Sequence, residues 1–281
     1  PATRILGFLE QLPGVTGIFF DAYCQRGVAG RLYFSEENGL KIQAIRNQIS
    51  LWAADGLLST TEENWLIACL LESADRVANT ASVYGAFLKQ IKKTASKSLK
   101  MVAIAPLNSG KPFSLHKVFC EDATSLISTL SDTAITLTYI DPPYNHRQYS
   151  GNYHILETIA QWDLGNFIPR GVTGLRPTNE LTSPYCLRSR AYDAFKHLLA
   201  NLNSEAVLFS YNNEGILSEN DLLGLFHQFF GTVEIKKVEY HRFRADRDGE
   251  KRQYTGDQTV EFLVLASGRR HKKVDNHQAD S

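Results

Sequence analysis

Hydrophobic positions in the first third of the chain recur at helical spacing. Ile42, Ile45 and Ile49 are followed by Trp52, and the run begins with a capping-type sequence at Ser35. Asp55-Gly56 interrupts the pattern, and Ser59–Glu63 provides a second capping sequence. The same period then continues from Trp65 to Val77. The pattern therefore predicts two helices over residues 35–55 and 59–77, and it allows the second to extend to about Leu88.

From His116 onward the pattern changes to that of an α/β sheet. His116–Cys120 is predicted as a strand, and Ala123–Leu130 as a helix with Asp122 at its N-cap. Ala134–Ile140 is an uncharged, β-rich run, which is typical of a strand buried on both faces. A strand, a helix and a strand with short links predict a βαβ unit and a parallel sheet.

The remaining segments complete an α/β architecture preceded by a helical domain. Ala206–Tyr211 is expected to be another buried strand, and Val233–Phe243 and Val260–Ala266 to be antiparallel strands at the far edge. Glycine-rich residues 1–34 are predicted as a loop with one short strand at Gly17–Phe20. Further helices are expected at about 153–161, 191–202 and 221–230. The predicted regions are a connector (1–34), a helical region (35–115), an α/β region (116–267) and a basic tail (268–281).

Composition places the chain among ordinary folded proteins. Its 281 residues are 43% hydrophobic and 21% charged, which excludes a disordered or collagen-like chain. No stretch approaches the roughly 18 apolar residues that a membrane span needs. No signal peptide opens the sequence. We therefore expect a cytoplasmic protein without a membrane partner.

The four cysteines do not form a metal-binding pattern. Cys24, Cys69, Cys120 and Cys186 lie far apart, and no Cys-x-x-Cys is present. Widely spaced single cysteines are expected to be buried, reduced thiols. The sequence therefore predicts no metal site.

Charge is unevenly distributed, although 30 basic residues balance 30 acidic ones. From Arg76 to Cys120 there is no Asp or Glu, whereas eight Lys and Arg residues occur. Such a block suits a phosphate backbone, because each neutralised phosphate releases condensed counterions. The alternative is a solvated helix face, and the spacing of the central lysines agrees with either reading. These are Lys89, Lys92, Lys93 and Lys97.

The tetrapeptide Asp141-Pro142-Pro143-Tyr144 follows a predicted buried strand directly. In open α/β sheets, ligands bind beyond the carboxyl ends of the strands. A carboxylate, carbonyls without competing N–H groups and a flat ring form a cradle for the exocyclic amine of a planar base. A simple turn is the alternative. Asp122 and Ser210–Asn213 are predicted to end neighbouring strands, so polar groups converge at one sheet edge.

Longer segments resemble the Dam-like class of DNA adenine-N6 methyltransferases, and most closely its restriction–modification members. The resemblance covers nearly all of residues 10–266. It implies a Rossmann-like methyltransferase sheet with a helical target-recognition domain in residues 35–115. The segments that carry it are Tyr33–Gly39, Glu72–Gly85, Tyr139–Asn145, Arg147–Tyr149, Asn152–His154, Leu156–Ala160 and Ser210–Gly215.

The resemblance also implies a reaction and a site. The substrate is the N6 amine of adenine in DNA, and the methyl donor is S-adenosylmethionine. Asp141 and the carbonyls of Pro142 and Pro143 are expected to accept the amine hydrogens, which aims the nitrogen lone pair for direct transfer. Tyr144 is expected to stack on the flipped base. The expected cofactor contacts are Asp122, Ala123, Asp141 and Pro142, and the expected DNA contacts are Lys89, Lys92, Lys93, Lys97 and Arg147.

One departure from the family pattern concerns the start of the chain. The class opens with a Tyr-x-Gly-Ser-Lys-like segment and a Phe-x-Gly-x-Gly loop that binds the cofactor, and neither is present. Asp21–Gly30 matches such a loop poorly, since Gln25 and Arg26 stand where small residues are needed. Gly17–Tyr33 is interpreted as the connector that follows these motifs. The chain is therefore expected to be a truncated or partial sequence, or one half of a split enzyme.

Three alternatives remain open. In the first, the substrate is adenine in RNA instead of DNA. In the second, the chain is a catalytically incomplete fragment that binds DNA. In the third, a separate N-terminal half completes the enzyme. The Asp at the first position of the tetrapeptide favours adenine as the substrate, because in enzymes similar to the cytosine-N4 group the corresponding motif tends to begin with Ser. A cognate restriction endonuclease is a further expected partner. Binding of S-adenosylmethionine discriminates an active chain from an incomplete one.

Overall fold

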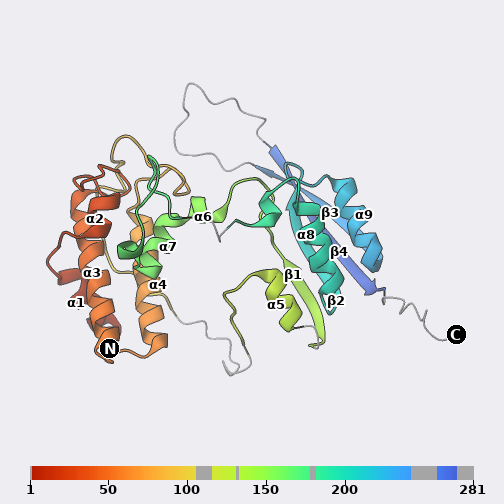
Figure 1. The fold of residues 1–281 in the computed structure, drawn as a ribbon, viewed down its shortest axis with the longest axis horizontal. Coiled ribbons are helices and arrows are strands. Elements are labelled where there is room, and N and C mark those ends of the chain that lie inside the picture. The colour runs from red at the N-terminus through yellow and green to blue at the C-terminus, as the bar shows by residue number, and fades with distance from the viewer. Residues whose placement is uncertain (1, 106–115, 131–132, 178–181, 242–257, 271–281) are drawn as a thin grey trace. The chain divides into compact units, whose positions relative to one another are not determined.

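The computed structural model describes residues 2–105, 116–130, 133–177, 182–241 and 258–270. The chain divides into two compact units (Figure 1). The helical unit contains Pro1–Lys111 and Tyr149–Thr182, and the sheet unit contains Pro112–Gln148, Ser183–Arg244 and the last strand. The predicted tail, residues 268–281, lies outside the described residues beyond Arg270. Each unit is described by itself.

The helical unit is built on two long helices that begin where their caps predict. Its helices are α1 (Ala2–Gln11), α2 (Ile18–Tyr23), α3 (Glu36–Ala54), α4 (Thr60–Arg76), α6 (Tyr149–Asn152) and α7 (His154–Gln161), with a 3-10 turn at Leu164–Asn166. Ser35 caps α3 by accepting from the Asn38 N–H. Ser59 and Glu62 form a capping box on α4. Both starts were predicted and are confirmed.

The short strand predicted at Gly17–Phe20 is wrong, because Ile18–Tyr23 is helix α2. The N–H groups in its first turn donate to a side chain that lies far away in the sequence. The Gln43 side-chain oxygen on α3 accepts from the N–H groups of Phe19 and Phe20, at 3.0 and 3.3 Å. The helical turn also places Phe19 and Tyr23 together in the buried core. Tertiary packing therefore decides this element.

Helix α4 ends at Arg76, so its predicted extension to Leu88 is wrong. The following chain wraps around Asn79, which is fully buried. The Asn79 side chain donates to the carbonyls of Leu32 and Leu88 and accepts from the Lys92 N–H. These bonds stabilise turns in place of a helix. The lysines at 89–97 therefore do not share the helix face that their spacing predicted.

The sheet unit contains a four-stranded mixed sheet. Its strands are β1 (Ile135–Ile140), β2 (Ser204–Asn212), β3 (Phe230–His241) and β4 (Gln258–Arg269), in the order β1-β2-β4-β3. β1 and β2 are parallel, and β4 is antiparallel to β2 and β3. Its helices are α5 (Ala123–Thr129), α8 (Ala191–Asn201) and α9 (Glu219–Phe229), with a 3-10 turn at Pro184–Cys186. The predicted α/β class and the antiparallel edge are confirmed.

The strand predicted at His116–Cys120 is not formed. All five residues are exposed and have no regular structure. A strand requires a hydrogen-bonded neighbour, and among the described residues β1 pairs only with β2. The predicted βαβ unit over 116–140 is therefore wrong. The parallel pair forms instead from β1 and β2, with α8 lying between them in the sequence.

Only one face of the sheet is well covered within the described ranges. α8 and α9 pack on it, with Phe195 and Phe226 against Phe209 of β2. On the opposite face, the side chains of Leu137 and Tyr139 are 53% and 57% exposed, and Leu265 is also exposed. We call this second face the open face. The prediction that β1 is buried on both faces is wrong.

Two further expectations concern membranes and cysteines. No helix in the described ranges is both long and apolar enough to cross a membrane. Cys24, Cys69 and Cys186 are buried thiols, as expected, whereas Cys120 is exposed. Among the described residues, no cluster of His, Cys, Asp and Glu is arranged to hold a metal ion.

Candidate active site

The Asp141–Tyr144 segment follows β1 directly and is fastened to the loop after β2. The Tyr144 carbonyl accepts from the Ile216 N–H at 2.8 Å and from the Tyr211 hydroxyl at 3.2 Å. The Tyr144 ring meets the buried Tyr211 ring edge-to-face, with centroids 6.4 Å apart. Asp141 is exposed, and 38% of Tyr144 is exposed. The backbone is thus fixed while the carboxylate and the ring stay accessible.

The polar end of β2 is tied to the start of β4. The Asn213 side-chain oxygen accepts from the Thr259 hydroxyl and the Val260 N–H, at 2.9 and 3.0 Å. Asn212 is buried, and its side-chain oxygen accepts from the Glu214 N–H at 3.1 Å. The convergence predicted for Asp141 and Ser210–Asn213 agrees with the parallel register, which pairs Ile140 with Phe209.

Glu261 is a carboxylate at this edge that the sequence reasoning missed. β4 runs antiparallel to β2, so its first residues lie at the carboxyl ends of β1 and β2, and Glu261 pairs with Asn212. Burial raises the pKa of Glu261, a hydrogen bond from Asn212 opposes this, and the charges of Asp141 and Glu214 raise it further. The predicted antiparallel return of the last strand was the signal that could have placed it here.

Asp122 is the N-cap of α5, as predicted. Its Oδ1 accepts from the N–H groups of Thr124 and Ser125, at 2.9 and 3.3 Å. The residue is exposed, and so is Ala123, which begins the helix. The expectation that Asp122 ends a strand of the sheet is wrong, because residues 116–120 form no strand.

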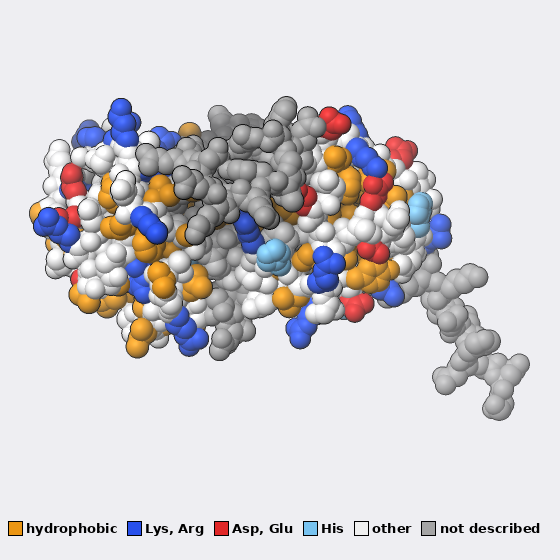
Figure 2. All heavy atoms as spheres, turned by 90° about the horizontal axis from the view of Figure 1, so that it is seen from above, with side chains coloured by type: hydrophobic (Ala, Val, Ile, Leu, Met, Phe, Trp, Pro, Cys, Tyr) orange, Lys and Arg blue, Asp and Glu red, His pale blue; other side chains and the backbone are white. Residues whose placement is uncertain are grey.

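The basic block lies in turns of the helical unit. Lys89, Lys93 and Lys97 are exposed, whereas the Lys92 ammonium donates to the Thr80 carbonyl at 2.7 Å. On the face seen in Figure 2, Lys and Arg are the main charged side chains of the helical unit, while both signs are mixed on the sheet unit. Arg147, after the tetrapeptide, is exposed.

The segment after the tetrapeptide enters the helical unit through a buried histidine. His154 on α7 is fully buried, with its Nε2 3.0 Å from the Tyr84 carbonyl and 3.2 Å from the Tyr33 hydroxyl. A carbonyl only accepts, so Nε2 carries the proton. Burial lowers the pKa of His154 to about 4. His154 is therefore a neutral packing residue of the core.

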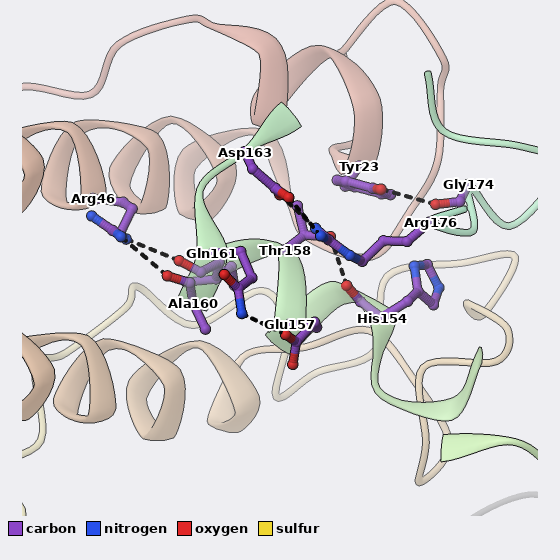
Figure 3. Close-up of polar contacts among 11 residues, drawn as sticks. Tyr23, Arg46, His154, Glu157, Thr158, Ala160, Gln161, Asp163, Gly174 and Arg176 are labelled. Atoms are coloured by element: carbon purple, nitrogen blue, oxygen red, sulfur yellow. Dashed lines mark hydrogen bonds and ion pairs between the residues drawn. The ribbon is translucent and has the colours of Figure 1, made fainter. Parts of the chain in front are cut away.

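Two arginines hold the end of α7 in place (Figure 3). Arg46 of α3 donates to the carbonyls of Ile159 and Ala160, at 2.9 and 3.1 Å. Arg176 forms two 2.7 Å bonds to the Asp163 carboxylate, which lowers the pKa of Asp163. The Tyr23 hydroxyl donates to the Gly174 carbonyl at 2.8 Å. The carboxyl end of helix α7 is thus fixed in the helical unit, and the contact between His154 and the Tyr84 carbonyl holds its first residue.

Comparison with known proteins decides the family. Residues 8–221 match the D12 class of N6 adenine-specific DNA methyltransferases. The chain belongs to this family. Its membership confirms the resemblance noted from the sequence and implies a Rossmann-like methyltransferase fold, of which the four-stranded mixed sheet is the part described. No solved structure matches the chain.

The curated relatives are named type II methyltransferases or modification methylases. The chain is 41% identical over 265 residues to type II methyltransferase M.NlaIII of Neisseria lactamica, covering 94% of this chain and 75% of that protein. It is 35% identical to modification methylase StsI of Streptococcus sanguinis, covering 84% and 35% of the two chains. It is 38% identical to M.CviAII of Paramecium bursaria Chlorella virus 1, covering 82% and 65%. The D12 chain is thus an adenine-N6 DNA methyltransferase related to type II modification methylases.

Proposed function

We propose that this D12 methyltransferase uses S-adenosylmethionine to methylate an adenine flipped out of duplex DNA, and that residues 141–144 hold its amine. The observation that supports this best is the fixed tetrapeptide. Ile216 and Tyr211 hold the Tyr144 carbonyl, while the Asp141 carboxylate and the Tyr144 ring remain accessible. A flipped base needs this combination of a rigid cradle and open functional groups.

Each residue of the tetrapeptide has a role in orienting the amine. The Asp141 carboxylate accepts one N6 hydrogen, and the carbonyl of Pro142 or Pro143 accepts the other. Both bonds draw the nitrogen lone pair out of conjugation with the ring and aim it at the methyl group. The Tyr144 ring stacks on the adenine. Half-buried Glu261, which accepts a hydrogen bond from Asn212, lies at the same sheet edge, and the charge of Asp141 contributes to its raised pKa.

The described residues supply acceptors for one part of the cofactor. S-adenosylmethionine provides an electrophilic methyl group when it is bound. Among the described residues, Asp122 uses Oδ1 for both of its helix bonds, and Oδ2 is left there to accept from a nucleoside amine or hydroxyl. We propose that Asp122 and Ala123 contact the cofactor at the start of α5, and that Asp141 and Pro142 contact it at the end of β1.

DNA contact is proposed for the exposed cations of both units. Lys89, Lys93 and Lys97 are exposed in turns, and Arg147 is exposed beside the tetrapeptide. Lys92 contributes charge from a fixed position, because its ammonium is bonded to Thr80. Such cations neutralise phosphates without reading the base sequence.

Replacement of Asp141 tests the assignment. Asp141→Ala is expected to lower methyl transfer to plasmid DNA at least about a thousandfold, because an oriented acceptor is lost. DNA affinity is expected to stay within about twofold, since no phosphate contact is removed. Asp193→Ala, at an exposed carboxylate of α8, is the matched control and is expected to leave both unchanged. An equal loss of affinity and activity in Asp141→Ala would contradict the role.

A second candidate divides the cofactor site between two polypeptides. The open face and the unpaired edge of β1 among the described residues favour it, because a Rossmann-like sheet is normally covered on both faces. In this proposal a separate N-terminal half supplies the glycine loop. Calorimetric titration of S-adenosylmethionine separates the two: micromolar binding by the chain alone supports a single-chain site, and no binding by a folded chain supports the divided one.

The relatives suggest a biological setting. Two of them are named type II methyltransferases and one is named a modification methylase. We propose that this chain likewise modifies DNA in a restriction–modification system, with a cognate restriction endonuclease as its functional partner. An RNA substrate is tested with matched DNA and RNA oligonucleotides. Methyl transfer to RNA alone would replace DNA as the substrate.

A further inference from the structure

Two tyrosine rings are exposed to solvent shortly after the tetrapeptide, one on Tyr149 at the start of α6 and one on Tyr153 between α6 and α7. Tyr149 and Tyr153 are 55% and 43% exposed, and their rings meet edge-to-face with centroids 5.7 Å apart. Tyr149 comes five positions after Tyr144, so the chain keeps their Cα atoms within about 18 Å of each other. This limit is covalent and holds for any arrangement of the two units.

The backbone of α6 is held firmly beneath these rings. The Tyr84 N–H donates to the Asn152 carbonyl at 2.7 Å, and the Tyr153 N–H donates to the Tyr149 carbonyl at 2.9 Å. The next residue, His154, is fully buried with its Nε2 at the Tyr84 carbonyl. The rings are therefore presented on a fixed backbone, and ordering them on a ligand requires little further loss of entropy.

The surrounding charge suits an anionic polymer. Between Asp141 and Glu157 the chain has no acidic residue, while His146 and Arg147 are both exposed. Aromatic rings beside cations are the usual means of holding nucleic acid, since bases stack on the rings and phosphates pair with the cations. A peptide or lipid partner would not require this pairing.

We propose that Tyr149 and Tyr153 stack on bases of the target duplex next to the flipped adenine, and so compensate for the stacking that the duplex loses. The proposal rests on the proposed function. Extrusion of one base leaves an unpaired partner and an open step, and stabilising this state lowers the cost of flipping. The pair acts on the DNA around the reacting base, so it governs binding of the distorted duplex and not the orientation of the amine.

A duplex with one abasic site tests the proposal without knowledge of the recognition sequence. We expect the wild-type protein to bind this duplex more tightly than its fully paired counterpart in fluorescence anisotropy. Tyr149→Ala and Tyr153→Ala are each expected to reduce the preference by about tenfold, the scale of one lost base–aromatic stack. Tyr149→Phe and Tyr153→Phe keep the ring and are expected to retain it. Phe8→Ala, at an exposed ring of α1, is the matched control.

Chemical protection of the wild-type protein supplies a measurement that does not depend on any variant. The abasic duplex is expected to protect Tyr149 and Tyr153 from nitration by tetranitromethane, read by mass spectrometry. Tyr139 on the open face is the internal reference and is expected to stay reactive. Equal nitration with and without DNA, or an unchanged preference in both Ala variants, would overturn the stacking role. If the wild-type protein bound neither duplex, the proposed function itself would be refuted.

Discussion

The helical unit and the sheet unit each have a buried core, but the two cores are enclosed in different ways. In the helical unit, α1 to α4 and α7 enclose a core that contains fully buried Tyr23, Tyr33 and Phe34. In the sheet unit, α8 and α9 cover one face, while Leu137 and Tyr139 remain exposed on the other. Exposed apolar side chains such as Phe8 and Leu57 occur in the helical unit as well, but those of the sheet unit include a set on one face of the sheet, which offers surface for a further contact.

Polar groups follow the same division. In the helical unit some of them, such as Arg46 and Asn79, are buried and tied to backbone carbonyls. At the carboxyl ends of the strands, Asp141 and Asn213 are exposed and Glu261 is half-buried. Buried polar bonds fix one structure, and exposed ones remain able to bind a ligand. The buried polar groups therefore stabilise the fold, whereas the accessible ones at the sheet edge are those that can contact a ligand.

Truncation of one aromatic residue in each unit tests most directly whether the buried core and the open face contribute differently to stability. Phe34→Ala removes a fully buried ring that contacts Phe19 and is expected to lower the free energy of unfolding by about 3–5 kcal/mol. Tyr139→Ala on the open face is expected to change it by less than about 1 kcal/mol. Urea unfolding followed by circular dichroism measures both. A comparable loss in Tyr139→Ala would show that the open face is covered in solution.

The pH dependence of stability gives the next largest effect, and it belongs to the helical unit. Burial lowers the pKa of His154 to about 4, below its ordinary value of 6.5. Between these values the unfolded chain binds the proton and the folded chain does not. The contribution of neutral His154 to the free energy of unfolding is therefore fully present above pH 6.5, and it is lost as the pH drops toward 4. From pH 7.5 to 5, this group is expected to cost about 2 kcal/mol.

Substitution isolates the contribution of His154. His154→Gln keeps an N–H donor for the Tyr84 carbonyl and cannot titrate, so its stability is expected to fall less between pH 7.5 and 5 than that of the wild type. His227→Gln, at an exposed position on α9, is expected to keep the wild-type pH dependence. Parallel slopes for the wild type and His154→Gln would rule out a buried neutral histidine.

Elements with local signals were predictable from the sequence, and those decided by distant contacts were not. The starts of α3 and α4 follow from capping residues within one turn of each helix. Helix α2 depends on Gln43, more than 20 residues away, and the end of α4 depends on the bonds of Asn79 to Leu32 and Leu88. No local pattern reports such partners.

The candidate site shows the same limit. Asp141–Tyr144 stands out in the sequence because the tetrapeptide directly follows a strong β pattern, which is β1 in the structure. Glu261 was missed because its position depends on the antiparallel register of β4 against β2. The prediction of a strand at residues 116–120 is wrong for a related reason. An apolar pattern alone does not show whether a neighbouring strand is present to pair with it.

The smallest expected effect tests the basic block. The double variant Lys93→Ala/Lys97→Ala removes two exposed cations of the helical unit, and the double variant Lys196→Ala/Lys236→Ala removes two exposed cations of the sheet unit. If the first pair contacts phosphates, the slope of log affinity against log salt is expected to flatten by about 2. The second pair is expected to leave the slope unchanged. Binding should weaken equally on unrelated duplexes, because phosphate contacts carry no sequence information. If both double variants flatten the slope equally, diffuse surface charge rather than the helical unit attracts the DNA, and the division of roles between the units would not extend to phosphate binding.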